Sequence, residues 1–120
     1  MATITEDYVS FETAKLLKDK GFDVPCMGRY SVRSKEFHLD CTRLCNNGGL
    51  FECSAPTHQM AMKWLREVHK LHIEPHIQSY KNYNGDIYNL DGELLLGFPS
   101  ESPEQACETA ILYCLKNLIK

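Results

Sequence analysis

The chain has 120 residues, 43% of them hydrophobic and 24% charged, and its 13 Lys and Arg against 16 Asp and Glu give a formal charge of −3. These values are typical of one globular domain over residues 1–120 and exclude disordered and fibrous chains. No apolar run approaches the ~20 residues that a membrane span needs, and the mild acidity argues against nucleic-acid binding through bulk charge. Residues 1–7 have neither the basic nor the apolar part of a secretory signal, so we expect a cytoplasmic protein that makes no membrane contact.

The six cysteines form an even set that is compatible with disulfides. Because we expect a reducing compartment, free thiols are the better prediction. Cys107 and Cys114 lie two turns apart on a predicted helix, about 10.5 Å along its axis, which is beyond disulfide reach. We therefore interpret these two as small core residues.

The first predicted helix lies between Ser10 and Gly21. Ser10 is a favourable N-cap, and Gly21 suits the left-handed position after a helix, with Phe22 folding back on the last turn. These start and stop signals predict a short amphipathic helix with its lysines on the outside.

The second predicted helix has the strongest pattern in the chain. Ser54 or Thr57 caps it, Pro56 suits its first turn, and its end is expected near Leu71. Trp64 lies in the middle of the apolar stripe, where we expect it to anchor the core. The stripe consists of Met60, Ala61, Trp64, Leu65, Val68 and Leu71. The other face carries Gln59, Lys63, Arg66, Glu67 and Lys70.

The third predicted helix opens with Ser102, Pro103 and Gln105, which suit the N-cap, N1 and N3 positions of a capping box. We expect this helix to run to the end of the chain.

The remaining segments alternate polar and apolar residues as strands do. Residues 29–33 and 36–39 predict a hairpin through Ser34 and Lys35, followed by a strand over 50–53, although an all-loop structure of residues 23–53 is an alternative. After the second helix, a strand within residues 72–80 contains Pro75, which confines it to a sheet edge or a strand start.

Two Asn-Gly-type pairs indicate turns further along the chain. Asn84-Gly85 and Asp91-Gly92 are type I′ turn signals, and the second joins predicted strands over 86–90 and 93–96. We expect an α+β fold with one antiparallel sheet, made of a C-terminal three-stranded meander and the N-terminal hairpin, packed by three helices.

Two clusters of metal-ligating residue types occur. Cys41, Cys45, Cys53 and His58 form a C-x3-C-x7-C-x4-H pattern, whose thiolates and imidazole are zinc ligands, but it lacks a C-x2-C knuckle and its middle gap is short. The second cluster, His69, His72 and His76, is explained by cations favoured at a helix C-terminus and by surface histidines. We predict no metal, with the first cluster as the one candidate.

Catalytic and cofactor motifs are absent from the sequence. It contains no G-x-S-x-G, P-loop, G-x-G-x-x-G or H-E-x-x-H motif, and no local pattern selects one Cys-His pair as a nucleophile and base. We therefore predict that the protein is not an enzyme and needs no cofactor.

Nucleic-acid binding has a topological argument, because the order helix, three strands, helix from Ser54 onward resembles the double-stranded-RNA-binding domain. That family carries lysines at the start of its last helix, whereas this chain has Ser102, Pro103, Glu104 and Gln105 there, which argues against nucleic acid as a partner. A separate hypothesis places single strands on Arg29, Arg33 and Lys35, which alternate with aromatic residues. The preferred alternative is a solvated strand face with Tyr30, Val32 and Phe37 turned to the core.

A third candidate surface is a tyrosine cluster near the Asn84-Gly85 pair. Tyr80, Tyr83 and Tyr88 could bind a partner, since tyrosine is enriched at interfaces, or could form cross-strand pairs.

Residues 8–17, 20–23, 54–57, 60–69 and 112–115 together resemble a family of small uncharacterised proteins of gut bacteria and their phages or other mobile elements. The resemblance covers nearly the whole chain and implies a small accessory protein, but it transfers no activity to any residue. The leading hypothesis is therefore a non-enzymatic protein that binds a protein partner or itself.

Overall fold

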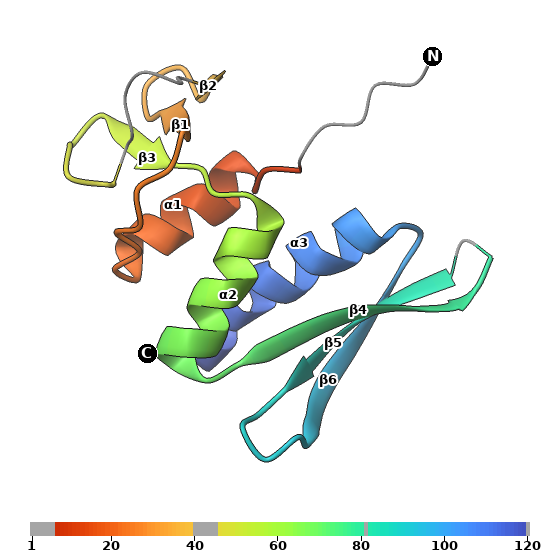
Figure 1. Ribbon diagram of the computed structural model, residues 1–120. Helices are drawn as coiled ribbons and strands as arrows, with labels where there is room; N and C mark the ends of the chain where they lie inside the picture. Colours follow the sequence, from red (N-terminus) through yellow and green to blue (C-terminus); the bar gives the residue numbers. More distant parts are fainter. Residues whose placement is uncertain (1–6, 40–45, 81, 120) are drawn as a thin grey trace.

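The computed structural model describes residues 7–39, 46–80 and 82–119, and it has the predicted α+β fold (Figure 1). These residues form three α-helices, one π-helical segment and two three-stranded antiparallel sheets, with strand orders β2-β1-β3 and β4-β5-β6. The elements in chain order are α1 (Phe11–Asp19), β1 (Gly28–Ser31), β2 (Phe37–Leu39), β3 (Glu52–Ser54), α2 (His58–His69), β4 (His72–Ser79), β5 (Asn82–Tyr88), β6 (Leu94–Ser100), α3 (Pro103–Tyr113) and the π-helical segment η1 (Cys114–Leu118).

The predicted caps form the helix ends. The Ser10 hydroxyl accepts a hydrogen bond from the Thr13 amide at 3.3 Å, and Gly21 follows α1 with a φ of +94°. The Phe22 amide donates to the Leu17 carbonyl at 2.9 Å, which completes the expected helix stop.

The other two helices also begin where expected. Thr57, not Ser54, caps α2, where its hydroxyl accepts from the Met60 amide at 3.2 Å. Pro56 therefore precedes the cap instead of lying in the first turn. Ser102 caps α3 by accepting from the Gln105 amide at 3.1 Å.

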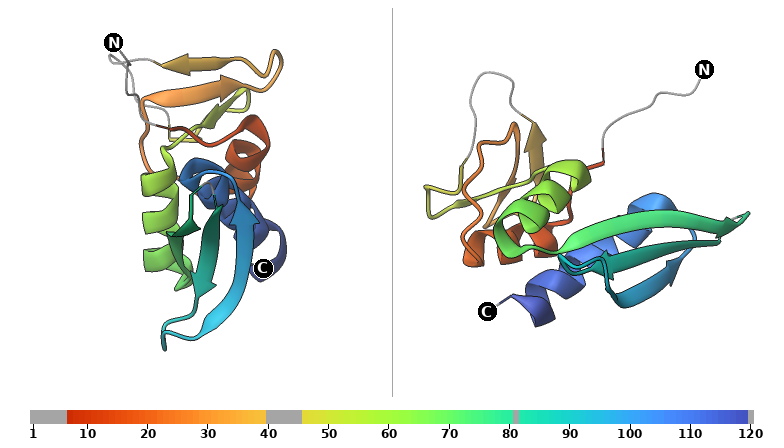
Figure 2. Two further views of the ribbon diagram at one scale, coloured as in Figure 1. Left: turned by 90° about the vertical axis from the view of Figure 1, so that its right-hand side faces the viewer. Right: turned by 60° about the horizontal axis from the view of Figure 1, so that its bottom comes forward.

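The expectation of a single sheet is wrong, because the N-terminal hairpin and the C-terminal meander belong to separate sheets. Each sheet packs on its own helix: β3 contacts α1, whereas β4, β5 and β6 all contact α3. Helices α1 and α2 stand between the two sheets (Figures 1 and 2). Alternation shows which face of a strand is apolar, but it carries no information about which other strand it joins.

The prediction of a turn at Asn84-Gly85 is also wrong, since both residues lie inside β5 and the chain reverses between Ser79 and Asn82. Gly85 serves a different purpose. A Cβ at this position would lie 2.5 Å from the carbonyl oxygen of Ala106, so the glycine allows α3 to rest directly on the strand.

The turn predicted at Asp91-Gly92 is shifted by one residue and differs in type, because the hydrogen bond that closes it spans Asn89 to Gly92 and leaves Leu90 and Asp91 as the central residues. The Asn89 carbonyl accepts from the Gly92 amide at 3.1 Å, and Gly92 alone has positive φ, +79°. A type I′ turn needs positive φ at both central residues.

One core joins the helices, the β4-β5-β6 sheet and β3, whose Cys53 belongs to it. Trp64 is buried, as predicted, and packs edge-on against Phe22 with ring centroids 5.4 Å apart. Cys107 and Cys114 are buried free thiols, as expected. Among the described residues, no helix has the length and apolar character to cross a membrane.

Candidate binding groove

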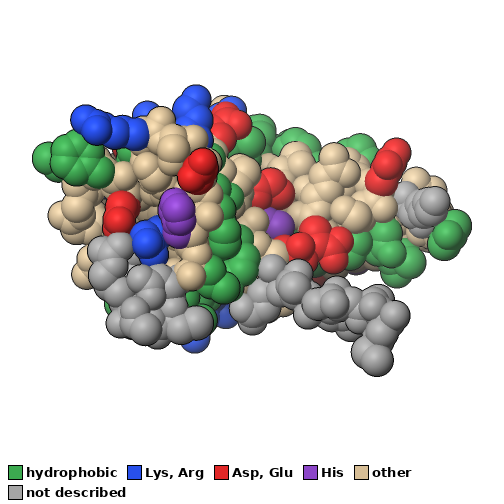
Figure 3. Space-filling view, turned by 90° about the horizontal axis from the view of Figure 1, so that it is seen from above, with side chains coloured by type: hydrophobic (Ala, Val, Ile, Leu, Met, Phe, Trp, Pro, Cys, Tyr) green, Lys and Arg blue, Asp and Glu red, His purple; other side chains and the backbone are tan. Residues whose placement is uncertain are grey.

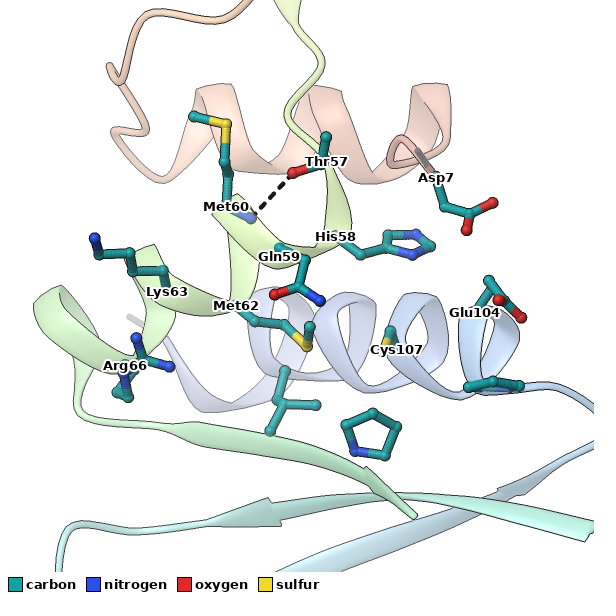
Figure 4. A pocket seen from close by; sticks show the side chains of 13 residues that line it. Asp7, Thr57, His58, Gln59, Met60, Met62, Lys63, Arg66, Glu104 and Cys107 are labelled. Atoms are coloured by element: carbon teal, nitrogen blue, oxygen red, sulfur yellow. Dashed lines mark hydrogen bonds between the residues drawn. The ribbon is translucent and has the colours of Figure 1, made fainter. Parts of the chain in front are cut away.

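Helix α2, strand β4 and the first turns of α3 enclose a groove of about 890 Å³ (Figure 4). This volume lies within the range of small-ligand and peptide-side-chain sites. The groove is lined by Asp7, Thr57, His58, Gln59, Met60, Met62, Lys63, Arg66, Ile73, Pro75, Pro103, Glu104 and Cys107.

The floor of the groove is apolar. Met62 comes from α2, Ile73 and Pro75 come from β4, and Cys107 comes from α3. Ile73 and Cys107 are buried, so the floor is continuous with the core. Such a surface favours an apolar side chain of a ligand, because burial removes its area from water.

The two ends of the groove carry opposite charges. Lys63 and Arg66 lie at one end, and Asp7 and Glu104 lie at the other (Figure 4). The Gln59 amide lies between them and offers both donors and an acceptor. The groove therefore has a positive end and a negative end in addition to its apolar floor.

Helical spacing explains how α2 supplies its share of the lining. Gln59, Met62, Lys63 and Arg66 occur at i, i+3, i+4 and i+7, which places them on one face of α2. Sequence reasoning assigned the polar members of this set to a solvent-facing side. The groove becomes visible only when the start of α3 is placed opposite them.

A hydrogen-bonded cluster beside the groove joins α1, α2 and α3. His58 Nε2 lies 2.9 Å from Glu108 Oε1, and the hydroxyls of Ser10 and Thr13 donate to Glu108 Oε2. Burial alone would raise the pKa of Glu108, but the hydrogen bonds from His58, Thr13 and Ser10 outweigh it and hold the pKa below its usual value. This cluster fixes the end of α2 that borders the groove.

Cys107 and His58 both line the groove, which raises the question of nucleophilic chemistry. Burial, followed by the charges of Glu104, Asp7 and Glu108, raises the pKa of the Cys107 thiol to about 11. A thiol with this pKa is protonated at neutral pH, whereas a nucleophilic cysteine needs a lowered pKa. His58, moreover, is directed to Glu108.

The three candidate tyrosines do not form one patch. Tyr80 is 85% exposed beyond the end of β4. Tyr83 and Tyr88 lie five residues apart on β5, so their side chains are on opposite faces of the sheet. Tyr83 shares the α3 side with Gly85, and the Tyr88 hydroxyl donates to Asp86 Oδ2 at 3.5 Å.

The basic residues of the first sheet do lie close to aromatic rings. The Arg33 guanidinium is 5.7 Å from the centre of the Phe51 ring, and the Lys35 ammonium is 5.7 Å from that of Phe11. Arg29 differs, because its Nε forms an ion pair with Glu52 at 3.3 Å.

The metal candidates are only partly described. Cys41 and Cys45 lie outside the described residues, so the four-ligand zinc set stays a prediction. Of its other members, Cys53 is buried in β3 and His58 contacts Glu108. Within residues 7–39, 46–80 and 82–119, no three His, Cys, Asp or Glu side chains are grouped to hold a metal ion.

The second histidine cluster is dispersed. His72 lies 3.8 Å from Glu74 and His76 lies 2.7 Å from Asp86, so these two face carboxylates of the second sheet. His69 instead packs against Trp64, with ring centroids 4.7 Å apart.

Comparisons of the chain with protein-family models, with curated proteins and with solved structures found no match. The geometry and chemistry of the groove are therefore the basis for assigning a function.

Proposed function

We propose that the protein is a non-enzymatic, cytoplasmic binding module that holds a short segment of a partner protein in the α2–β4–α3 groove. The observation that carries this proposal is the apolar floor between a cationic end, Lys63 and Arg66, and a carboxylate end, Asp7 and Glu104. The raised pKa of Cys107 supports binding over nucleophilic catalysis.

The polarity of the groove defines the segment that fits it. An acidic side chain would approach Lys63 and Arg66, a basic one would approach Asp7 and Glu104, and an apolar one between them would contact Met62. Charged groups at the ends of such a groove contribute more to specificity than to affinity. A segment with two like charges would meet repulsion at one end.

The test uses four blocked tripeptides with leucine in the centre and Lys or Glu at each end, measured by isothermal titration calorimetry. We expect the two mixed-charge peptides to bind with a dissociation constant on the order of 0.1–1 mM, and the Lys-Leu-Lys and Glu-Leu-Glu peptides to bind at least tenfold more weakly. Equal binding of all four peptides, or no binding of any, would refute the proposal.

A charge-reversal variant sharpens this test. Lys63→Glu combined with Arg66→Glu gives the groove carboxylates at both ends, so the preferred peptide should become Lys-Leu-Lys. Lys15→Glu is the matched control, because Lys15 is an exposed lysine of α1 that does not line the groove. This control should leave the order of the peptides unchanged.

The second candidate function, single-strand nucleic-acid binding, is supported by the Arg33–Phe51 and Lys35–Phe11 pairs. Cations beside aromatic rings are the elements of such sites. An oligothymidine titration at low salt tests it: binding that weakens with salt and is lost in Arg33→Ala would support this function, and no binding at low salt would eliminate it.

A further inference from the structure

Strand β6 forms an edge of the second sheet, on the side away from β4. It pairs with β5, and in the described parts of the chain no strand pairs with its other edge. An edge strand presents unpaired backbone N–H and C=O groups, which are a template for a further strand. β6 is seven residues long, and Pro99 near its end has no N–H to offer. The five residues before it, 94–98, are long enough to receive a short strand.

The side chains of this edge are apolar and exposed. Leu94 is 58% exposed, and Leu95 and Leu96 follow it at 40% and 37%. Such a run on an edge strand is costly in water, and proteins commonly place lysine at such positions to prevent pairing. β6 has no charged residue of either sign.

The surroundings of the edge are negatively charged. Between Lys81 and Lys116 the sequence has no Lys or Arg. Exposed carboxylates stand on both sides of β6, with Glu93 before it and Glu101 after it. In the view of Figure 3, Asp and Glu side chains, but no described Lys or Arg, lie over the right-hand part, where the sheet extends.

From these observations we infer that the free edge of β6 binds an extended segment of a partner protein in which apolar residues are flanked by Lys or Arg. The backbone of the segment adds a strand to the sheet, its apolar side chains cover Leu94 and its neighbours, and its cations face Glu93 and Glu101. This mode of recognition combines main-chain hydrogen bonds with side-chain specificity. The site is separate from the groove and does not depend on it.

Charge complementarity favours this occupant over a second copy of the chain. Two β6 strands paired antiparallel about Gly97 would place Glu93 of one copy opposite Glu101 of the other at both ends. Like charges directly opposite each other destabilise a strand pair. A cationic segment removes that repulsion.

The experiment uses two blocked peptides as long as β6, both of alternating Val and Thr, one with Lys and the other with Glu at the two ends. Binding to the ¹⁵N-labelled protein is followed by NMR at low ionic strength. We expect the Lys peptide to shift β6 amides and the Glu peptide to bind at least tenfold more weakly, a difference that decreases with added salt.

Two variants test the roles of charge and leucine. Glu93→Lys combined with Glu101→Lys changes exposed residues only, and it should invert the preference between the peptides. Leu94→Ser should weaken binding of the Lys peptide about threefold or more, whereas Leu50→Ser should have no effect, because Leu50 is 83% exposed but lies outside the second sheet. None of these variants changes a residue that lines the groove.

Three results would overturn the inference. The first is equal binding of both peptides, or no binding of either at millimolar concentration. The second is a set of shifted amides in the groove instead of β6. The third is a dimer in sedimentation equilibrium that Leu94→Ser dissociates, because a second copy would then occupy the edge.

Discussion

Replacing Gly85 by alanine tests how closely α3, a helix that also lines the groove, rests on the second sheet. The added Cβ would lie 2.5 Å from the Ala106 carbonyl oxygen and 3.1 Å from its carbonyl carbon. Both are backbone atoms, and ordinary van der Waals contact begins at 3.4 Å. Helix and strand must therefore separate by about 0.9 Å, the difference between 3.4 Å and the 2.5 Å approach to the carbonyl oxygen.

The expected cost follows from two opposing effects. Overpacking of a rigid contact costs up to about 3 kcal/mol of unfolding free energy. Replacing glycine returns about 0.4–1 kcal/mol, because the unfolded alanine chain has less conformational entropy. The net destabilisation is about 2 kcal/mol, and for 120 residues this lowers the Tm by roughly 8 °C.

Thermal unfolding followed by circular dichroism measures this effect, with two matched controls. Gly49→Ala adds a Cβ with no atom within 4 Å and should leave the Tm nearly unchanged. Gly92→Ala also meets no atom, but its φ of +79° costs about 1 kcal/mol and should lower the Tm by roughly 4 °C. A Gly85→Ala protein that melts within 2 °C of the wild type would refute the close approach of α3.

Two further predictions concern the titratable groups beside the groove. Because the pKa of Glu108 is lowered in the folded state, its contribution to stability is present above the usual glutamate pKa of about 4.3 and is lost as the pH falls through the lower folded pKa. Glu108→Gln should therefore lower the unfolding free energy by about 1–3 kcal/mol at pH 7. Between pH 5 and 2 the variant should lose less unfolding free energy than the wild type, as urea unfolding at each pH will measure. Parallel losses in both proteins would contradict this. The second prediction concerns Cys107, whose thiol pKa is raised to about 11. At pH 8 this thiol should react with iodoacetamide about a hundredfold more slowly in the folded protein than in the urea-unfolded protein, as peptide mass mapping will show. Equal rates would contradict the burial of the thiol.

The helices could be predicted because their signals are local. Ser10, Thr57 and Ser102 each accept a hydrogen bond from an amide three residues ahead, a contact that depends on almost nothing else in the fold. The burial of Trp64 is predictable for a similar reason, since its position in an apolar stripe is a property of the helix alone.

Gly85 shows why part of the second sheet was missed. Asn-Gly is typical of a tight turn, but glycine also occurs where another backbone comes very close. Only the position of Ala106, 21 residues later in the chain, distinguishes these two uses. The separation of the two sheets was missed for the same reason, because it depends on which helix each strand contacts and not on the local sequence.

The groove could not be predicted either, because it too depends on which segments lie next to each other in the fold. Lys63 and Arg66 have the pattern of an ordinary solvent-facing side of a helix, and Glu104 has that of a first-turn carboxylate that stabilises a helix N-terminus. Their position along one groove arises only when α2 and α3 are packed on the same sheet. The tyrosine hypothesis failed to define one surface because two residues of one strand that are five apart face opposite sides.

The central claim is that the α2–β4–α3 groove is a binding site with a fixed charge direction. The most direct measurement is a ¹H–¹⁵N NMR titration of the protein with the mixed-charge Lys-Leu-Glu peptide. We expect saturable shifts concentrated on the amides of Gln59, Met62, Lys63 and Cys107, and we expect Lys63→Glu combined with Arg66→Glu to abolish them. Shifts that lie elsewhere, or that persist unchanged in this variant, would contradict the central claim.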